Sequence, residues 1–251
     1  MTAIVGVLCE DGVVVGSDSS VTFMHGRFGT IEQPADKIKI INNSIIVAGT
    51  GSVGLGQRFL EIVKKKWSDK KFDGSAVNIG KHLSRKAIED FNFTGIGFGN
   101  NQSIDYGALI AFPSNKKFYL CELDPQKFQP EMKDETMWYC SMGSAQIITD
   151  PFLGFIRSIF WRDKKPNLSE GVLAVKWTLL QAIELNTGGV NGPIHIAVLH
   201  RDGSALIARQ LSEEELDNYR QSIQELRQHI ESFKEKFNPA KGKDLPEAPR
   251  S

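Results

Sequence analysis

The sequence predicts an α+β fold of four layers, in which two antiparallel sheets face each other and helices cover both outer sides (αββα). Short apolar segments bounded by turn residues occur in groups, and each of the first two groups is followed by two longer stretches with helical periodicity. Packing sheet on sheet with the helices outside buries all of these elements. The chain has 251 residues, 41% of them hydrophobic, and no internal linker rich in Pro, Gly or Ser, so we expect one large domain.

The first half of the chain is expected to form paired strands followed by two helices. Glu10-Asp11-Gly12 joins the first two strands in a tight hairpin. Ser52 follows the fourth strand as a candidate N-cap. We interpret Phe23 to Ala35 as a long connection that alters the approach to the end of the sheets. The predicted strands lie near residues 3–9, 12–18, 37–41 and 44–50, and the helices lie near 52–67 and 75–92.

The second half repeats this pattern. We expect strands near residues 104–112, 117–123, 136–141, 194–200 and 204–210, and helices near 144–161 and 168–186. The main domain therefore spans residues 1–211. Apolar residues at helical spacing then predict an amphipathic helix over 212–237, which packs either on its own domain or on a neighbouring subunit. Residues 238–251, with several prolines and lysines, are expected to form a disordered tail.

The composition argues against several classes of function. Thirty basic and thirty acidic residues give a formal net charge of zero, so we expect neither nucleic acid nor a membrane as a partner. The sequence contains no secretory signal and no apolar run of about 18 residues. Cys9, Cys121 and Cys140 are widely spaced, as is typical of reduced core residues in a cytoplasmic protein. Neither they nor the five histidines have the spacing of a metal site, and we expect no metal and no cofactor.

Thr2 is the candidate nucleophile. Once Met1 is removed, the α-amine of Thr2 can act as the general base for its own hydroxyl, because a free α-amine has a pKa of about 7.7–8.0. The first hairpin would bring Asp18 beside this terminus. A threonine after Met1 is by itself a common start, so the candidate depends on the residues around it. No propeptide precedes Thr2 in this sequence, and we expect removal of Met1 alone to activate it.

The chain resembles the β-type subunits of the proteasome, within the N-terminal-nucleophile (Ntn) hydrolases, and among them a bacterial proteasome homologue. Four blocks carry the resemblance in order: residues 2–22, Asp36-Lys37-Ile38, Ile46 to Gly51, and Ser141-Met142-Gly143-Ser144, with weaker similarity to residue 210. The resemblance implies the αββα fold, a threonine peptidase without a cofactor, and assembly into a homo-oligomeric ring or larger multimer that acts on peptides or proteins. Whether an ATPase serves as a partner stays open.

The resemblance also implies roles for individual residues. Thr2 corresponds to the nucleophile, and Lys37 lies within hydrogen-bonding reach of its hydroxyl. A lysine cation there favours the neutral form of the amine by like-charge repulsion, while Asp18 compensates the buried charge of Lys37. Spacing alone favours an ordinary ion pair of Asp18 and Lys37 at strand ends, and the resemblance in the surrounding blocks reverses this preference.

Two further positions have both a catalytic and a purely structural interpretation. Gly49 corresponds to the glycine whose backbone N–H points at the scissile carbonyl, although a strand-to-helix turn can need glycine for its geometry alone. Ser144 corresponds to the serine that hydrogen-bonds the terminal amine, although a serine before a helix can also be a cap.

The sequence departs from the family pattern further along the chain. Active members carry an aspartate followed three residues later by a serine and paired glycines, whereas Glu184 to Gly192 contains neither an aspartate nor a serine. Asn186 or Thr187 can substitute as hydrogen-bonding groups, but neither contributes negative charge.

The resemblance also places the primary substrate pocket. By position, Val21, Val47 and Gly51 line it and leave room for an apolar side chain, while Lys39 favours an acidic one. The sequence therefore predicts a threonine-type peptide hydrolase with an open cleavage preference. Two alternatives stand beside this prediction: a proteasome-like scaffold subunit that has lost activity, and an amidohydrolase that uses the same chemistry on small amides.

Overall fold

A computed structural model describes residues 2–25, 28–69, 72, 74–93, 104–185 and 189–233, with the side chains of residues 22–32 and 93 left out. The chain divides into two units, Met1–Ser212 and Glu213–Ser251. The second unit contains helix α5 (Glu213–Ser232), an amphipathic helix with three glutamates in its first turn. The expected tail at 238–251 lies outside the described residues.

The first sheet carries the N-terminal strand near its centre. In spatial order its strands are β10 (Tyr139–Met142), β1 (Ile4–Leu8), β2 (Gly12–Ser17), β11 (His195–Asp202) and β12 (Ala205–Gln210). All neighbours are antiparallel, and Ile4 lies opposite both Met142 and Ser17. Every residue of β1 and β2 is buried, because helices cover one face of this sheet and the second sheet covers the other.

The second sheet is formed by the middle of the chain. Its strands, again in spatial order and antiparallel, are β5 (Ile38–Ile41), β6 (Ile45–Gly51), β7 (Tyr106–Ser114), β8 (Lys117–Leu123) and β9 (Pro130–Met132). The register places Gly51 opposite Tyr106. Residues more than fifty positions apart in the sequence are thereby joined at the end of this sheet.

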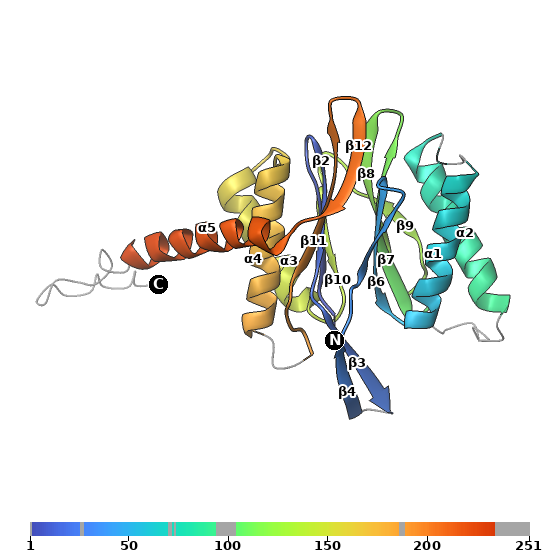
Figure 1. The fold of residues 1–251 in the computed structure, drawn as a ribbon, viewed down its shortest axis with the longest axis horizontal. Coiled ribbons are helices and arrows are strands. Elements are labelled where there is room, and N and C mark those ends of the chain that lie inside the picture. Colours follow the sequence, from blue (N-terminus) through green and yellow to red (C-terminus); the bar gives the residue numbers. More distant parts are fainter. Residues whose placement is uncertain are drawn as a thin grey trace, which may run out of the picture. The chain divides into compact units, whose positions relative to one another are not determined.

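Helices cover both outer faces, which confirms the predicted αββα fold. Helices α1 (Val53–Ser68) and α2 (Ala76–Phe93) contact the second sheet, and α3 (Gln146–Ile156) and α4 (Leu168–Leu185) contact the first (Figure 1). The sheets approach closely at Gly6, where a Cβ atom would lie 3.0 Å from side-chain carbons of both Leu109 and Leu120. A glycine here lets β1 pack directly on the opposite sheet.

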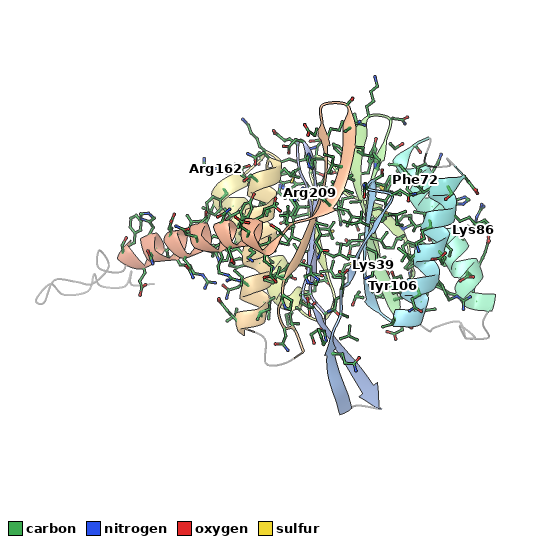
Figure 2. All side chains as sticks on the ribbon, viewed as in Figure 1. Lys39, Phe72, Lys86, Tyr106, Arg162 and Arg209 are labelled. Atoms are coloured by element: carbon green, nitrogen blue, oxygen red, sulfur yellow. The ribbon has the colours of Figure 1, made fainter. Side chains whose placement is uncertain are left out.

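An apolar core fills the space between the second sheet and helices α1 and α2. It contains several aromatic rings, including Phe59, Phe91 and Phe128, whose contacts with one another are mostly edge to face. Phe72 and Tyr106 belong to the same core, and Figure 2 shows their side chains on the side of α1 and α2. This core holds α1 firmly against β6 and β7, which fixes the region where the two elements meet.

Three elements differ from the sequence-based expectation. The stretch interpreted as a long connection is instead a separate antiparallel hairpin, β3 (Ser20–His25) and β4 (Phe28–Pro34), with a register irregularity between Phe23 and Met24. Its glycines and proline interrupt the period-two alternation that reveals a strand. The short strand β9 was also missed, and the helix expected over 144–161 begins at Gln146 and becomes a π-helix, η1, over Arg157–Trp161. Figure 1 shows the hairpin projecting near the N-terminus.

Candidate active site

Thr2 lies at the start of β1, where the segment before α3 holds it in place. The Thr2 carbonyl oxygen accepts a hydrogen bond from the backbone N–H of Ala145 at 3.2 Å. Gly143 has a φ of 99°, and a Cβ atom at this position would lie only 2.2 Å from the Thr2 carbonyl oxygen. Residue 143 must therefore be glycine for two reasons, its left-handed backbone and its close approach to Thr2.

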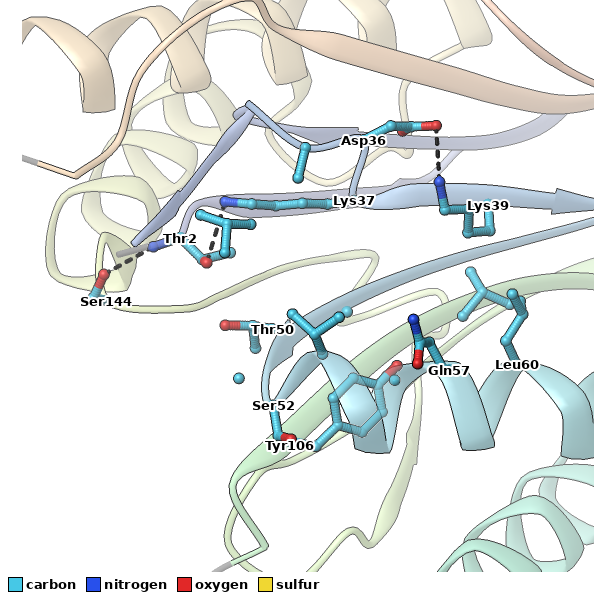
Figure 3. A pocket seen from close by; sticks show the side chains of 17 residues that line it. Thr2, Asp36, Lys37, Lys39, Thr50, Ser52, Gln57, Leu60, Tyr106 and Ser144 are labelled. Carbon is cyan, nitrogen blue, oxygen red and sulfur yellow. Dashed lines mark hydrogen bonds and ion pairs between the residues drawn. The ribbon is translucent and has the colours of Figure 1, made fainter. Parts of the chain in front are cut away.

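Lys37 connects Thr2 to a buried carboxylate. Its Nζ donates a hydrogen bond to Thr2 Oγ1 at 3.2 Å (Figure 3). The same Nζ lies 2.6 Å from Asp18 Oδ1. The side chains of Lys37 and Asp18 are only 5% and 0% exposed. Asp18 also accepts hydrogen bonds from the backbone N–H groups of Ala3 at 2.9 Å and Ser20 at 3.0 Å. A buried charge pair is tolerated when its remaining hydrogen-bonding positions are filled in this way.

The position of this pair follows from the local fold. Asp18 comes directly after β2, and the β1–β2 hairpin places its backbone N–H 3.1 Å from the carbonyl oxygen of Ala3. Lys37 comes directly before β5, at the edge of the opposite sheet. The Thr2 hydroxyl therefore lies between two sheets and receives a cationic donor from one of them. Such a donor stabilises negative charge that develops on the hydroxyl oxygen.

Ser144 contacts the Thr2 nitrogen and not the helix that follows. The Thr2 N–H donates to Ser144 Oγ at 3.0 Å (Figure 3). Helix α3 begins at Gln146 with Ala145 at the N-cap position and no side-chain cap, so Ser144 is not a helix cap. Met1 precedes Thr2 in the sequence, and the donor is a peptide N–H as long as Met1 is attached. After removal of Met1 the same nitrogen would be the terminal amine.

A cavity of about 430 Å³ opens beside Thr2, between β5 and the junction of β6 with α1. It is lined by Val21, Val47 and Gly51, the three positions expected there, together with Lys37, Gly49 and Ser144. The volume lies within the range of roughly 300–1,000 Å³ that is usual for small-ligand sites. Figure 3 shows Asp36, Lys37 and Lys39 along one wall and Thr50, Gln57, Leu60 and Tyr106 along the other.

Several residues of this cavity were missed in the sequence. One face of α1 lines it, with Val53, Gly56, Gln57 and Leu60. Their i, i+3, i+4, i+7 spacing is a visible helical signal, although it does not tell which cavity the face meets. Tyr106 arrives from β7 through its pairing with Gly51, and no local pattern near residue 106 indicates this.

Gly49 also has a structural reason to be glycine. A Cβ atom at this position would lie 2.6 Å from the Tyr106 hydroxyl oxygen and 2.7 Å from the ring. The close approach of β6 to Tyr106 therefore excludes any side chain at position 49. Ser52 was expected to cap α1 with its side chain. It occupies the N-cap position, but its side chain makes no cap hydrogen bond.

Asp36 contacts two groups near the cavity. Lys39 Nζ forms an ion pair with Asp36 Oδ2 at 3.2 Å, and His195 Nδ1, which makes no hydrogen bond with the described residues, lies 3.5 Å from Asp36 Oδ1. Asn186 and Thr187 lie outside the described residues. The segment that follows them returns to the site, because the carbonyl oxygen of Asn191 accepts a hydrogen bond from the Ser19 N–H at 3.0 Å.

Within the described parts of the chain, no group of three or more His, Cys, Asp or Glu side chains is arranged to hold a metal ion. All three cysteines are free and buried. In the described helices, no segment combines the length and apolar character needed to cross a membrane.

Comparison with known proteins agrees with this geometry. A search of curated proteins finds no significant match. The family model described as "Proteasome subunit" matches residues 2–148, which is more than half of the chain and includes Thr2, Asp18, Lys37, Gly49 and Ser144. With its four-layer sandwich, the chain belongs to the proteasome subunit family.

Proposed function

We propose that this protein is a threonine-type peptidase of the β-subunit kind, in which removal of Met1 exposes Thr2 as the nucleophile. One observation carries the proposal. The Nζ atom of Lys37, held by the buried carboxylate of Asp18, donates a hydrogen bond to Thr2 Oγ1. A structural ion pair alone would not need to reach the hydroxyl of the second residue in the chain.

The proposed reaction begins with proton transfer within Thr2. The neutral amine takes the hydroxyl proton, and Oγ1 attacks the substrate carbonyl while the ammonium of Lys37 stabilises the negative charge that develops on Oγ1. The N–H of Gly49 would receive the carbonyl oxyanion. The Thr2 ammonium then donates its proton to the leaving amine, which departs and leaves an ester on Thr2. Water, deprotonated by the same amine, hydrolyses this ester and restores the hydroxyl.

Ser144 has a supporting role in this scheme. Its Oγ lies 3.0 Å from the Thr2 nitrogen, so it would orient the amine toward the hydroxyl. Asn186 or Thr187 would supply a second hydrogen bond in place of the missing carboxylate. The catalytic domain would comprise residues 1–211, with the helix over 212–237 as an added element.

We further propose that the protein acts in the cytoplasm as a homo-oligomer on peptides or unfolded proteins. The family consists of subunits of a larger assembly, which supports this proposal. Several large apolar side chains of α3 and η1 are exposed, including Ile147, Phe155 and Phe160, as is typical of surfaces that contact another subunit.

A second candidate function is a scaffold subunit without activity. The observation that favours it is the absence of aspartate and serine between Glu184 and Gly192. In this case Lys37 and Asp18 would keep the strand ends together without serving catalysis.

The test is the intact mass of the purified protein before and after incubation with a threonine-reactive epoxyketone or β-lactone. We expect loss of Met1 and a single adduct, which is absent in Thr2→Ala and retained in Thr2→Ser. A chain that keeps Met1, or a processed chain that forms no adduct, would refute the peptidase and favour the scaffold.

A further inference from the structure

Tyr106 lines the cavity beside Thr2, and its hydroxyl has no partner in the described part of the chain. Tyr106 is 4% exposed and forms no hydrogen bond with another described residue. A buried hydroxyl without a partner costs free energy, so one that borders a cavity is a candidate contact for a ligand.

Two glycines give this hydroxyl its access to the cavity. Tyr106 passes between β6 and the first turn of α1, where a Cβ atom at Gly49 would lie 2.6 Å from the hydroxyl oxygen. A Cβ atom at Gly56 would lie 3.0 Å from the ring and 3.6 Å from the same oxygen. Any side chain at either position would push the ring away or cover its polar end. Figure 3 shows Tyr106 and Gln57 on the wall opposite Lys37 and Lys39.

The ring itself is held rigidly. Its centroid lies 5.9 Å from those of both Phe59 and Phe128 and 6.3 Å from that of Phe91. Burial also raises the pKa of Tyr106, so its hydroxyl stays protonated and uncharged. The cavity therefore presents a neutral hydrogen-bonding group at a fixed position.

The remaining walls favour an uncharged occupant. Val21, Val47 and Leu60 are apolar. Lys37 is paired with Asp18, and Lys39 is paired with Asp36, so neither cation is left without a counter-charge. An acidic side chain of a substrate would have to compete with Asp36 for Lys39. Because Lys39 lies at the surface, an ion pair with it would contribute little to binding. A large side chain with an apolar body and a neutral polar end satisfies both the walls and the hydroxyl.

We propose that the cavity selects a tyrosine on the acyl side of the cleaved bond, and that Tyr106 is the residue that distinguishes tyrosine from phenylalanine. This inference rests on the proposed peptidase function of the same site. The phenol of the substrate exchanges a hydrogen bond with the Tyr106 hydroxyl, on the wall that Gln57 also lines. Phenylalanine fills the same apolar space but leaves the Tyr106 hydroxyl without a partner, which a site built around a hydrogen bond penalises.

Peptide binding can be measured without catalysis. In the Thr2→Ala protein, which lacks the nucleophile, we would determine Kd for peptides that differ only in Tyr, Phe, Leu or Glu at the selected position. A neutral hydrogen bond changes affinity by roughly two- to tenfold, so we expect the tyrosine peptide to bind about fivefold more tightly than the phenylalanine peptide. Adding Tyr106→Phe should bring this ratio to about one. The matched control, Tyr119→Phe, removes a hydroxyl of the same sheet outside the cavity and should keep the ratio.

Cleavage by the unmutated protein provides the second readout. In proteins that keep Thr2, the ratio of kcat/KM for tyrosine and phenylalanine substrates should be retained in Tyr119→Phe and should fall to about one in Tyr106→Phe. Equal affinities for tyrosine and phenylalanine, strongest binding of the glutamate peptide, or a ratio that Tyr106→Phe leaves unchanged would each overturn the inference. The adduct at Thr2 reports on the peptidase function separately, so a protein that forms the adduct but shows no tyrosine preference refutes only the specificity.

Discussion

Removing the negative charge of Asp18 is expected to destabilise the protein far more than removing both charges of the pair. In Asp18→Asn, the ammonium of Lys37 stays in a site where its side chain is 5% exposed, without the carboxylate that lies 2.6 Å away. Breaking a buried pair from one side typically costs about 3–5 kcal/mol. Because Lys37 lines a cavity that water can enter, we expect the lower end, about 3 kcal/mol.

The double variant provides the comparison. In Asp18→Asn, the amide oxygen of the new side chain can still accept one of the backbone hydrogen bonds from Ala3 or Ser20. Lys37→Met removes the uncompensated cation while keeping the approximate length of the side chain. We therefore expect Asp18→Asn with Lys37→Met to lose less than about 1.5 kcal/mol.

Thermal unfolding at one fixed protein concentration measures the difference. For a unit of about 200 residues, 1 kcal/mol corresponds to a change in Tm of roughly 2–4 °C, so the single variant should unfold about 6–12 °C lower and the double variant less than about 6 °C lower. If the single variant unfolds within about 2 °C of the unmutated protein, or if the double variant is less stable than the single one, the pair is not a desolvated charge pair and the reasoning is wrong.

Three further outcomes follow from the site and the core. Gly143→Ala should slow formation of the Thr2 adduct by roughly 100-fold, because its Cβ displaces the Thr2 carbonyl; an unchanged rate would contradict the close contact. Ser144→Ala should slow the same reaction about tenfold without changing Tm, since the Thr2 nitrogen loses one acceptor; a rate equal to that of the unmutated protein would argue against orientation by Ser144. Burial raises the pKa of Cys121 to about 12, and all three cysteines should be inert to a thiol reagent at pH 8 until the protein unfolds, which counting of the reacted thiols can check. A native protein whose thiols react at once would refute the burial. Because the pKa of Cys121 is higher in the folded state than in the unfolded chain, its contribution to the free energy of unfolding is complete below about pH 9 and is lost as the pH rises toward 12.

Local sequence patterns are sufficient for the elements closest to the N-terminus. The apolar residues of β1 and β2 and the turn at Glu10-Asp11-Gly12 specify a hairpin, and its register brings residues 2 and 18 to the same end. The helical spacing of α1, α2 and α4 was also readable, since their apolar faces repeat with a helical period. The hairpin β3–β4 was not, because glycines and a proline interrupt its alternation.

Local patterns cannot decide between alternatives that depend on a distant neighbour. Ser144 could be a helix cap or a partner of the Thr2 nitrogen, and the choice follows from where β10 places it beside β1. Likewise, the sequence around Gly49 does not indicate that Tyr106 packs against it, because Tyr106 comes from β7, more than fifty residues later.

The sequence by itself determined the αββα fold class, the hairpin behind Thr2 and the proteasome-like order of Thr2, Asp18 and Lys37. These properties rest on periodicity, turn residues and motif order, which are local in the chain. The tertiary structure alone decided that Lys37 reaches both Asp18 and Thr2, and that Tyr106 enters the cavity beside Thr2 between Gly49 and Gly56. Contacts of this kind arise when two sheets and a helix pack together, and close packing fixes them to within a fraction of an ångström without leaving a periodic trace in the sequence.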